Sequence, residues 1–278
     1  MTDAAAPQQP ADQGLNGSYQ HILVERRPNG VVIVTLDWPE RRNAMSGPMT
    51  DSWARLMAVL RGDRDLRALV VTGAGSAFCS GGDVSWIGSE PEASVDDLRA
   101  RMLPFYRAWL SVRELEVPTI AAINGAAIGA GLALALACDL RYAAADAKLG
   151  VPFTSLGMHP GMATTYLLPQ VVGLAVAREL LLTGRLVTGT EAAALGLVSG
   201  ALPAAGVLAH ALEVADRIAA TAPVATRLTT LALRAGHADV EAALQWEAMA
   251  QPITLATADL HEGLRAQQER RPPRFTGR

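Results

Sequence analysis

PTIAAINGAAIGAGLALALACDLRYA, residues 118–143, places glycine-rich turns between apolar segments. Its beginning has the β-branched and apolar character of a buried strand, which Gly125 ends. Residues 129–138 are mostly small or apolar and are predicted to form a helix, and residues 139–145 return as a strand. The N–H of Ala130, at the start of that helix, is expected to point outward with the helix dipole behind it.

The alternation of strands and helices continues on both sides of this segment. Two β-branched runs, at 21–26 and 31–36, flank Pro28-Asn29-Gly30, a sequence that favours a hairpin turn. From about residue 207 onward the apolar spacing is only helical. The sequence therefore predicts an α/β core, residues 19–205, and a C-terminal helical region, residues 206–278. After the hairpin, the predicted strands are 67–71, 117–124 and 139–145. The predicted helices are 47–61, 95–114, 129–138, 161–168, 172–182, 190–195, 207–220, 223–236, 238–249 and 254–267.

Composition excludes several classes of protein. The 278 residues are 50% hydrophobic and include 24 basic and 27 acidic side chains, so no excess of basic charge indicates nucleic-acid binding. Cys79 and Cys138 are the only cysteines, which fits a reducing compartment and predicts no disulfide framework. Residues 1–18 lack the pattern of a signal peptide and are expected to form a disordered leader. The most apolar window, 126–138, is too short to span a bilayer, so we expect a soluble cytoplasmic protein.

A second glycine-rich loop, VVTGAGSAFCSGGD at 70–83, has two interpretations. Its first half resembles the phosphate-binding turn of a short-chain dehydrogenase. That turn requires a third glycine at the helix start, where this chain has Ala77-Phe78. Such enzymes also commonly use a Tyr-x-x-x-Lys pair, but Ala144 precedes Lys148 by four residues. The residues therefore disfavour dinucleotide binding.

The second half of the loop fits another chemistry. Ser80-Gly81-Gly82-Asp83 has no bulky side chains, so its backbone N–H groups can face a ligand. Together with the N–H of Ala130, such a donor can hold an oxygen on which negative charge develops, as in an oxyanion hole. The alternative is that both glycine patches only permit close packing of the backbone.

Taken together, the two patches and their flanking residues are similar to the crotonase superfamily, the enoyl-CoA hydratase/isomerase group. The resemblance runs from about residue 20 to the C-terminus, with its pieces in the family's order and spacing. These pieces are PERRNAMS (39–46), AFCSGGD (77–83), residues 118–143 quoted above, LGMHPG (156–161), LLLTGRLVTGTEAAALGLVS (180–199) and RPPRF (271–275).

The resemblance implies an α/β crotonase spiral of repeated ββα units and C-terminal helices that build a homotrimer or a dimer of trimers. It implies an acyl-CoA substrate, with coenzyme A as part of the substrate, no tightly bound cofactor and no metal. The family's two thioester-binding N–H groups map to Gly82 and Ala130. Basic residues such as Arg271 or Arg274 would reach a phosphate of the coenzyme or, equally, belong to a solvated tail. The residues implied to line the coenzyme are Arg41, Ala44, Ser80, Gly81, Asp83 and Val84.

This chain departs from the pattern at the two glutamates that family hydratases use for proton transfer. Ala133 occupies the first position and Phe153 the second. Neither side chain carries a proton, so efficient hydration is not expected. Phe153 would make the pocket drier and shape it for acyl chains or rings.

Other side chains are candidates for a nonstandard base. His159 is one candidate, because histidine is the residue type most suited to carrying a proton under physiological conditions, although it could instead pack beneath the next helix. Tyr106 and Arg101 lie on a helix that, by resemblance, borders the acyl pocket. Further candidates with more ordinary roles are Tyr166 in the core, Asp83 as a turn cap, and Cys79, which has no sign of an activated thiolate.

Two hypotheses of different class follow. The first is an isomerase or lyase of the enoyl-CoA hydratase/isomerase type, with nonstandard catalytic residues, that stabilises an enolate through a backbone oxyanion hole. The second is a noncatalytic acyl-CoA-binding or regulatory homologue.

Overall fold

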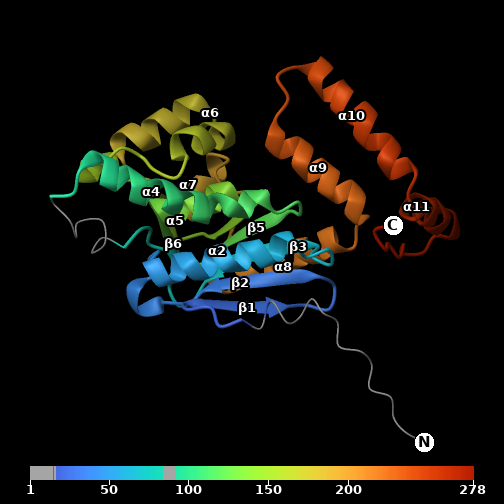
Figure 1. The fold of residues 1–278 in the computed structure, drawn as a ribbon, viewed down its shortest axis with the longest axis horizontal. Coiled ribbons are helices and arrows are strands. Elements are labelled where there is room, and N and C mark those ends of the chain that lie inside the picture. Colours follow the sequence, from blue (N-terminus) through green and yellow to red (C-terminus); the bar gives the residue numbers. More distant parts are fainter. Residues whose placement is uncertain (1–14, 16, 84–91) are drawn as a thin grey trace, which may run out of the picture.

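The computed structural model describes residues 15, 17–83 and 92–278. Most of the predicted leader lies outside the described residues. The fold combines two mixed sheets with surrounding helices (Figure 1).

The larger sheet has six strands in the order β1-β2-β3-β5-β7-β10. β1 and β2 form the predicted antiparallel hairpin, and all the other pairs in this sheet are parallel. The central strands are buried on both faces, as their continuous apolar runs predict. The strands span β1 (Ile22–Arg26), β2 (Val31–Leu36), β3 (Ala68–Gly73), β5 (Thr119–Ile123), β7 (Leu140–Ala144) and β10 (Gly200–Leu202).

The smaller sheet has the order β4-β6-β8-β9 and was not predicted. Its strands are two or three residues long, too short for an alternating or continuous apolar pattern to identify them. Only the β8–β9 pair is antiparallel. The strands span β4 (Ala77–Cys79), β6 (Ala126–Ile128), β8 (Lys148–Gly150) and β9 (Val187–Thr188).

The helices largely follow the predicted periodicity. α2 has the predicted bounds, and the predicted helix at 95–114 ends as a 3-10 turn after Leu110. α10 continues through Pro252 to Leu255, beyond its predicted end. The helices are α2 (Gly47–Arg61), α4 (Val95–Leu110), α5 (Ala130–Ala137), α6 (Thr164–Thr183), α7 (Gly189–Ala194), α8 (Ala204–Ala219), α9 (Pro223–Ala235), α10 (Val240–Leu255) and α11 (Ala258–Glu269), and the 3-10 turns are η1 (Pro39–Arg41), η2 (Ser111–Glu114) and η3 (Thr154–Leu156).

Aromatic packing joins α2 to α4. Trp53 and Trp109 are both fully buried and stack with ring centroids 5.0 Å apart. The indole N–H of Trp109 donates to the Thr50 hydroxyl at 3.0 Å, which satisfies its polar atom inside the core. These contacts hold α4 over the N-terminal half of the fold.

Helix α6 joins the two helices predicted at 161–168 and 172–182. It bends at Gly173, whose φ of 75° is not helical. Among the described residues α6 alone has the length and apolar composition to cross a bilayer, a criterion that core helices of soluble proteins also meet. Tyr166 on this helix is 59% exposed, so its predicted core position is wrong. The exposure follows from its place on the outer face of the helix.

The C-terminal helices leave the sheets after α8. α8 packs on β3, β5 and β7, whereas α9, α10 and α11 extend to one side (Figure 1). One partly buried ion pair, Arg234 to Asp139 at 2.6 Å, joins α9 to the start of β7. The same guanidinium also donates to the carbonyls of Arg113, Leu115 and Val117 and to the hydroxyl of Thr119. The domain boundary between residues 205 and 206 stays a prediction.

Candidate active site

The two glycine patches come together because the strands before them are parallel neighbours. Ala77 and Cys79 in β4 pair with Ala126 and Ala127 in β6. The carboxyl ends of parallel strands meet at the same edge of a sheet. The loop that holds Gly81 and the start of α5 therefore leave the smaller sheet side by side.

Missing side chains allow these segments to touch. Gly81 has a φ of +100°, and a Cβ on it would lie 2.7 Å from the Ile128 oxygen and 3.4 Å from the Ala130 nitrogen. A Cβ on Gly131 would overlap the Cys79 oxygen. Both glycines are thus required for backbone contact, as the close-packing interpretation expected. That role does not compete with the oxyanion interpretation, because close contact also brings the donors together.

The direction of each candidate N–H follows from the peptide that contains it. The Gly81 carbonyl accepts from the Met45 N–H at 2.8 Å, and no described peptide bond is cis. Since C=O and N–H point in opposite directions across a trans peptide, the Gly82 N–H points away from Met45. The Gly129 carbonyl accepts from the Ala133 N–H at 3.0 Å, so the Ala130 N–H points out of the helix start. Two outward-facing donors therefore lie on touching segments.

The residues predicted to line the coenzyme are also neighbours. Ser80 donates its N–H to the Arg42 carbonyl at 3.0 Å and its hydroxyl to the Arg41 carbonyl at 3.3 Å. A parallel bridge between Met45 and Gly82 extends this pairing past Ala44. Of the remaining residues of this set, Gly81 and Asp83 lie in the same loop, and Val84 lies outside the described residues. Contact of any of them with a coenzyme stays a prediction.

Asn43 is a buried polar residue in this region that the sequence analysis missed. It is fully buried and has a φ of 56°, a left-handed conformation in which asparagine is enriched. Its side-chain oxygen accepts from the Trp38 N–H at 2.8 Å, and its amide nitrogen donates to carbonyls of the second glycine-rich loop. The signal in the sequence that could have identified Asn43 is a single asparagine shortly before a predicted helix start.

Residues 26–278 match the sequence profile described as enoyl-CoA hydratase/isomerase. The chain belongs to this family. Human enoyl-CoA hydratase domain-containing protein 2, mitochondrial, is 37% identical over 277 residues, covering 96% of this chain and 93% of that protein. Rat mitochondrial methylglutaconyl-CoA hydratase is 34% identical over 265 residues, covering 93% of this chain and 82% of that protein. The crystal structure of an enoyl-CoA hydratase from Bacillus anthracis is 34% identical, with a TM-score of 0.88, and the match covers 93% of this chain and 100% of that chain.

The predicted family and the predicted α/β crotonase fold are thus confirmed. In this crotonase, the positions predicted to lack glutamates carry small or aromatic groups. Ala133 is fully buried one turn into α5, on the same helix face as Ala130. The Phe153 ring lies against Gly129, since a Cβ there would be 3.6 Å from its Cζ. An apolar ring therefore borders the turn that presents the Ala130 N–H.

Two candidate proton carriers of this crotonase, His159 and Tyr106, lie at the turn before α6. His159 is exposed, so the interpretation of a histidine packed beneath the helix is wrong; it sits instead in the turn between η3 and α6. Its Nδ1 lies 2.8 Å from the Pro160 carbonyl, which accepts only, so the neutral ring carries its lone pair on Nε2. Tyr106 is half-buried, and a Cβ on Gly161 would lie 2.6 Å from its hydroxyl. Burial raises the pKa of Tyr106, which favours its neutral form.

The remaining candidates have less suitable surroundings. Cys79 is fully buried, and burial raises its pKa to about 12, so it stays a thiol at neutral pH, as the sequence analysis expected. Arg101 lines a pocket of about 270 Å³ between α2 and α4. The Asp83 N–H donates to the Met45 carbonyl at 3.4 Å, and the predicted capping role of the Asp83 side chain stays a prediction. No group of three or more His, Cys, Asp or Glu side chains that could hold a metal occurs in the part of the chain that the structure describes.

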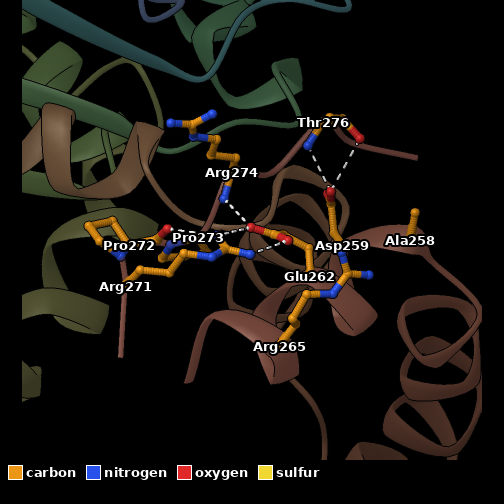
Figure 2. Close-up of a pocket in the computed structure, with 9 residues that line it drawn as sticks. All are labelled: Ala258, Asp259, Glu262, Arg265, Arg271, Pro272, Pro273, Arg274 and Thr276. Carbon is orange, nitrogen blue, oxygen red and sulfur yellow. Dashed lines mark hydrogen bonds and ion pairs between the residues drawn. The ribbon is translucent and has the colours of Figure 1, made fainter. Parts of the chain in front are cut away.

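The C-terminal arginines fold back on α11 (Figure 2). Arg271 forms a two-pronged pair with Glu262, at 2.6 and 3.0 Å, and also contacts Glu269 at 2.5 Å. The backbone N–H of Arg274 donates to Glu262 at 2.9 Å, and in Figure 2 the Arg274 guanidinium points away from that carboxylate. Residues 271–274 are therefore held against α11, and the alternative of a solvated tail stays open because the Arg271 side chain is still 35% exposed. A role in phosphate binding stays a prediction.

Proposed function

We propose that this crotonase binds an acyl-CoA thioester and stabilises its enolate with the N–H groups of Gly82 and Ala130. The observation that carries the proposal is the approach of Gly81 to the Ala130 nitrogen, with both donors facing out of their own elements. Two N–H groups on one thioester oxygen withdraw charge from the carbonyl, which acidifies the α-carbon. Fixed donors of this kind stabilise developing negative charge without reorganising in the reaction.

The reaction that follows enolate formation is not a standard hydration in this proposal. Hydration needs groups that position water and transfer a proton, and Ala133 and Phe153 do neither. His159 is the candidate proton carrier, because it is exposed and its neutral Nε2 has a free lone pair. Isomerisation, decarboxylation and C–C bond chemistry each use an oxyanion hole with one such group.

A second candidate function is noncatalytic acyl-CoA binding. The fully buried methyl group of Ala133 and the Phe153 ring against Gly129 favour it, because neither group transfers a proton. In that case the two N–H groups still hold the thioester oxygen, but no base removes the α-proton.

The proposal includes assembly as a homotrimer or a dimer of trimers. Helix α10 has no buried residue among those described, although it carries large apolar side chains. Val240, Met249 and Ile253 are all more than half exposed. A second copy of the chain that covers this helix would bury those side chains.

Proton exchange distinguishes the candidates. The protein is incubated in D2O with a saturated acyl-CoA, and deuterium at the α-carbon is followed by mass spectrometry, alongside water addition to a short enoyl-CoA. Exchange without hydration supports the enolate-forming enzyme, whereas tight binding without exchange supports the noncatalytic homologue. Fast hydration contradicts the role given to Ala133 and Phe153. Absence of thioester binding contradicts both candidates.

A further inference from the structure

We infer that Asn43 is a positioning residue that sets the orientation of the Gly82 N–H. This inference rests on the proposed function, because it concerns one of the two proposed donors to the thioester oxygen. Asn43 itself is fully buried and is assigned no contact with substrate. Its effect on the Gly82 N–H is transmitted through backbone groups of the loop that holds Gly82.

The Asn43 side chain fixes the loop that precedes Gly82. Its amide nitrogen donates to Ala77 O at 2.8 Å and lies within hydrogen-bond distance of Ala74 O, at 2.9 Å, and Phe78 O, at 3.2 Å. Its oxygen accepts from the Trp38 N–H at 2.8 Å. The two amide hydrogens thus serve several carbonyls of one loop, and all polar atoms of this buried side chain have partners.

The backbone around Asn43 fixes the other side of the same loop. The Cys79 thiol donates to the Asn43 carbonyl at 3.0 Å. Two residues after Asn43, the Met45 N–H donates to the Gly81 carbonyl at 2.8 Å. That bond orients the peptide that contains the Gly82 N–H, since the two groups of one trans peptide are antiparallel. Asn43 therefore holds the loop by its side chain and is linked to the Gly81–Gly82 peptide by its main chain.

A second asparagine links this loop to the other proposed donor. Asn124 follows β5, before the turn that leads through β6 to Ala130, and its amide nitrogen lies 3.4 Å from Ala77 O. The same amide donates to Gly75 O at 3.0 Å. Asn43 approaches this carbonyl oxygen from the segment that pairs with the loop of Gly82, and Asn124 approaches it from the segment that leads to Ala130. Loss of the Asn43 amide would remove the hydrogen bond from Asn43 to this shared carbonyl oxygen and so loosen the loop of Gly82.

The test uses Asn43→Gly, because glycine adopts a φ of 56° without strain, so that chiefly the side-chain amide is removed. The carbonyl carbon of an acyl-CoA labelled with 13C reports how strongly the bound thioester is polarised. Binding of an S-alkyl-CoA thioether, which has no carbonyl, reports the rest of the coenzyme site. Asn29→Gly is the matched control, since Asn29 is exposed and bonds to Asp216 on the surface.

For Asn43→Gly we expect loss of most of the 13C shift that wild type shows on binding. We also expect a fall of about a hundredfold in α-proton exchange, since misplacement by about 1 Å can cost that much. The thioether should bind within about threefold of wild type, so kcat falls while KM changes little. Asn29→Gly should behave as wild type.

Retention of the full 13C shift in Asn43→Gly would overturn the inference. A variant that fails to fold would also overturn it, because Asn43 would then be required for the fold rather than for placing one donor. If wild type itself shows no 13C shift on binding, the proposed function fails first, and the two failures are thereby distinguished.

Discussion

A Cβ on Gly81 would lie 3.4 Å from the backbone nitrogen of Ala130 and 2.7 Å from the oxygen of Ile128. Residues from separate glycine-rich loops are therefore in backbone contact at the edge of the smaller sheet. The contact depends on a residue without a side chain, at a φ of +100°. The two proposed donors, the N–H groups of Gly82 and Ala130, face away from their own elements at this contact.

Gly81→Ala should impair the proposed oxyanion hole and strain the loop. Losing one such donor costs about a hundred- to a thousandfold in rate, and the left-handed backbone adds about 1–3 kcal/mol of strain. α-Proton exchange and urea unfolding measure the two effects. Gly206→Ala is the control: a Cβ there meets nothing within 4 Å, so roughly 0.5–1 kcal/mol of helix stabilisation and unchanged exchange are expected. Wild-type exchange in Gly81→Ala would contradict the role of this contact.

His159→Gln should abolish most α-proton exchange while leaving acyl-CoA binding intact, if His159 is the proton carrier. Glutamine keeps a polar side chain of similar size but cannot take a proton at neutral pH. His261→Gln is the matched control, since His261 is an exposed histidine on α11. Deuterium incorporation and isothermal calorimetry provide the readouts. Equal exchange rates for both variants would eliminate His159 and direct attention to Tyr106.

Ala133→Glu should destabilise the fold. The side chain at 133 is fully buried, and an uncompensated buried charge costs about 3–5 kcal/mol. Urea denaturation measures the loss, with a glutamate in place of the exposed Ala204, in the first turn of α8, as the control. Ala133→Glu with Phe153→Glu restores the family's pair of carboxylates and is expected to add water to short enoyl-CoAs. If the double variant folds and binds but remains inactive, the pocket differs in more than these two side chains.

Both cysteines should be unreactive in the folded protein. Burial raises the pKa of Cys79 and that of Cys138 from 9.0 to about 12, so each is a thiol in the fold. Between pH 9 and pH 12 the thiols ionise in the unfolded chain but not in the folded one. The free energy of unfolding is therefore unaffected by these thiols below pH 9 and falls as the pH rises toward 12, by about 1.4 kcal/mol per pH unit for each thiol. A thiol reagent at pH 8 should label neither cysteine until denaturant is added. Rapid labelling of the native protein would contradict their burial.

Arg234→Ala should loosen α9 from the core. The change removes a partner from the partly exposed Asp139 carboxylate and from several carbonyls, at a cost below the roughly 3–5 kcal/mol of breaking a fully buried pair. Hydrogen exchange should rise along α9, and the free energy of unfolding should fall. Arg185→Ala removes surface pairs with Glu179 and Glu191 and should leave Tm nearly unchanged. Equal Tm values for the two variants would show that the Arg234–Asp139 pair does not hold α9 to the core.

Long periodic segments were predictable from sequence, and the contacts between them were not. The apolar positions of α2 predict its bounds, and the glycine patches identify Gly82 and Ala130 as candidate donors. β4 and β6, which bring those patches together, are three residues long and carry too little periodicity to be recognised. Asn43 was missed because the carbonyls that its amide contacts lie more than thirty residues away. The exposure of His159 and Tyr166 likewise depends on tertiary packing rather than on residue type.

A crystal structure with a bound, nonreactive acyl-CoA measures the proposed site most directly. We predict that the thioester oxygen lies about 2.7–3.1 Å from both the Gly82 nitrogen and the Ala130 nitrogen. A thioester oxygen bound elsewhere, or within reach of only one of these nitrogens, would contradict the proposed oxyanion hole.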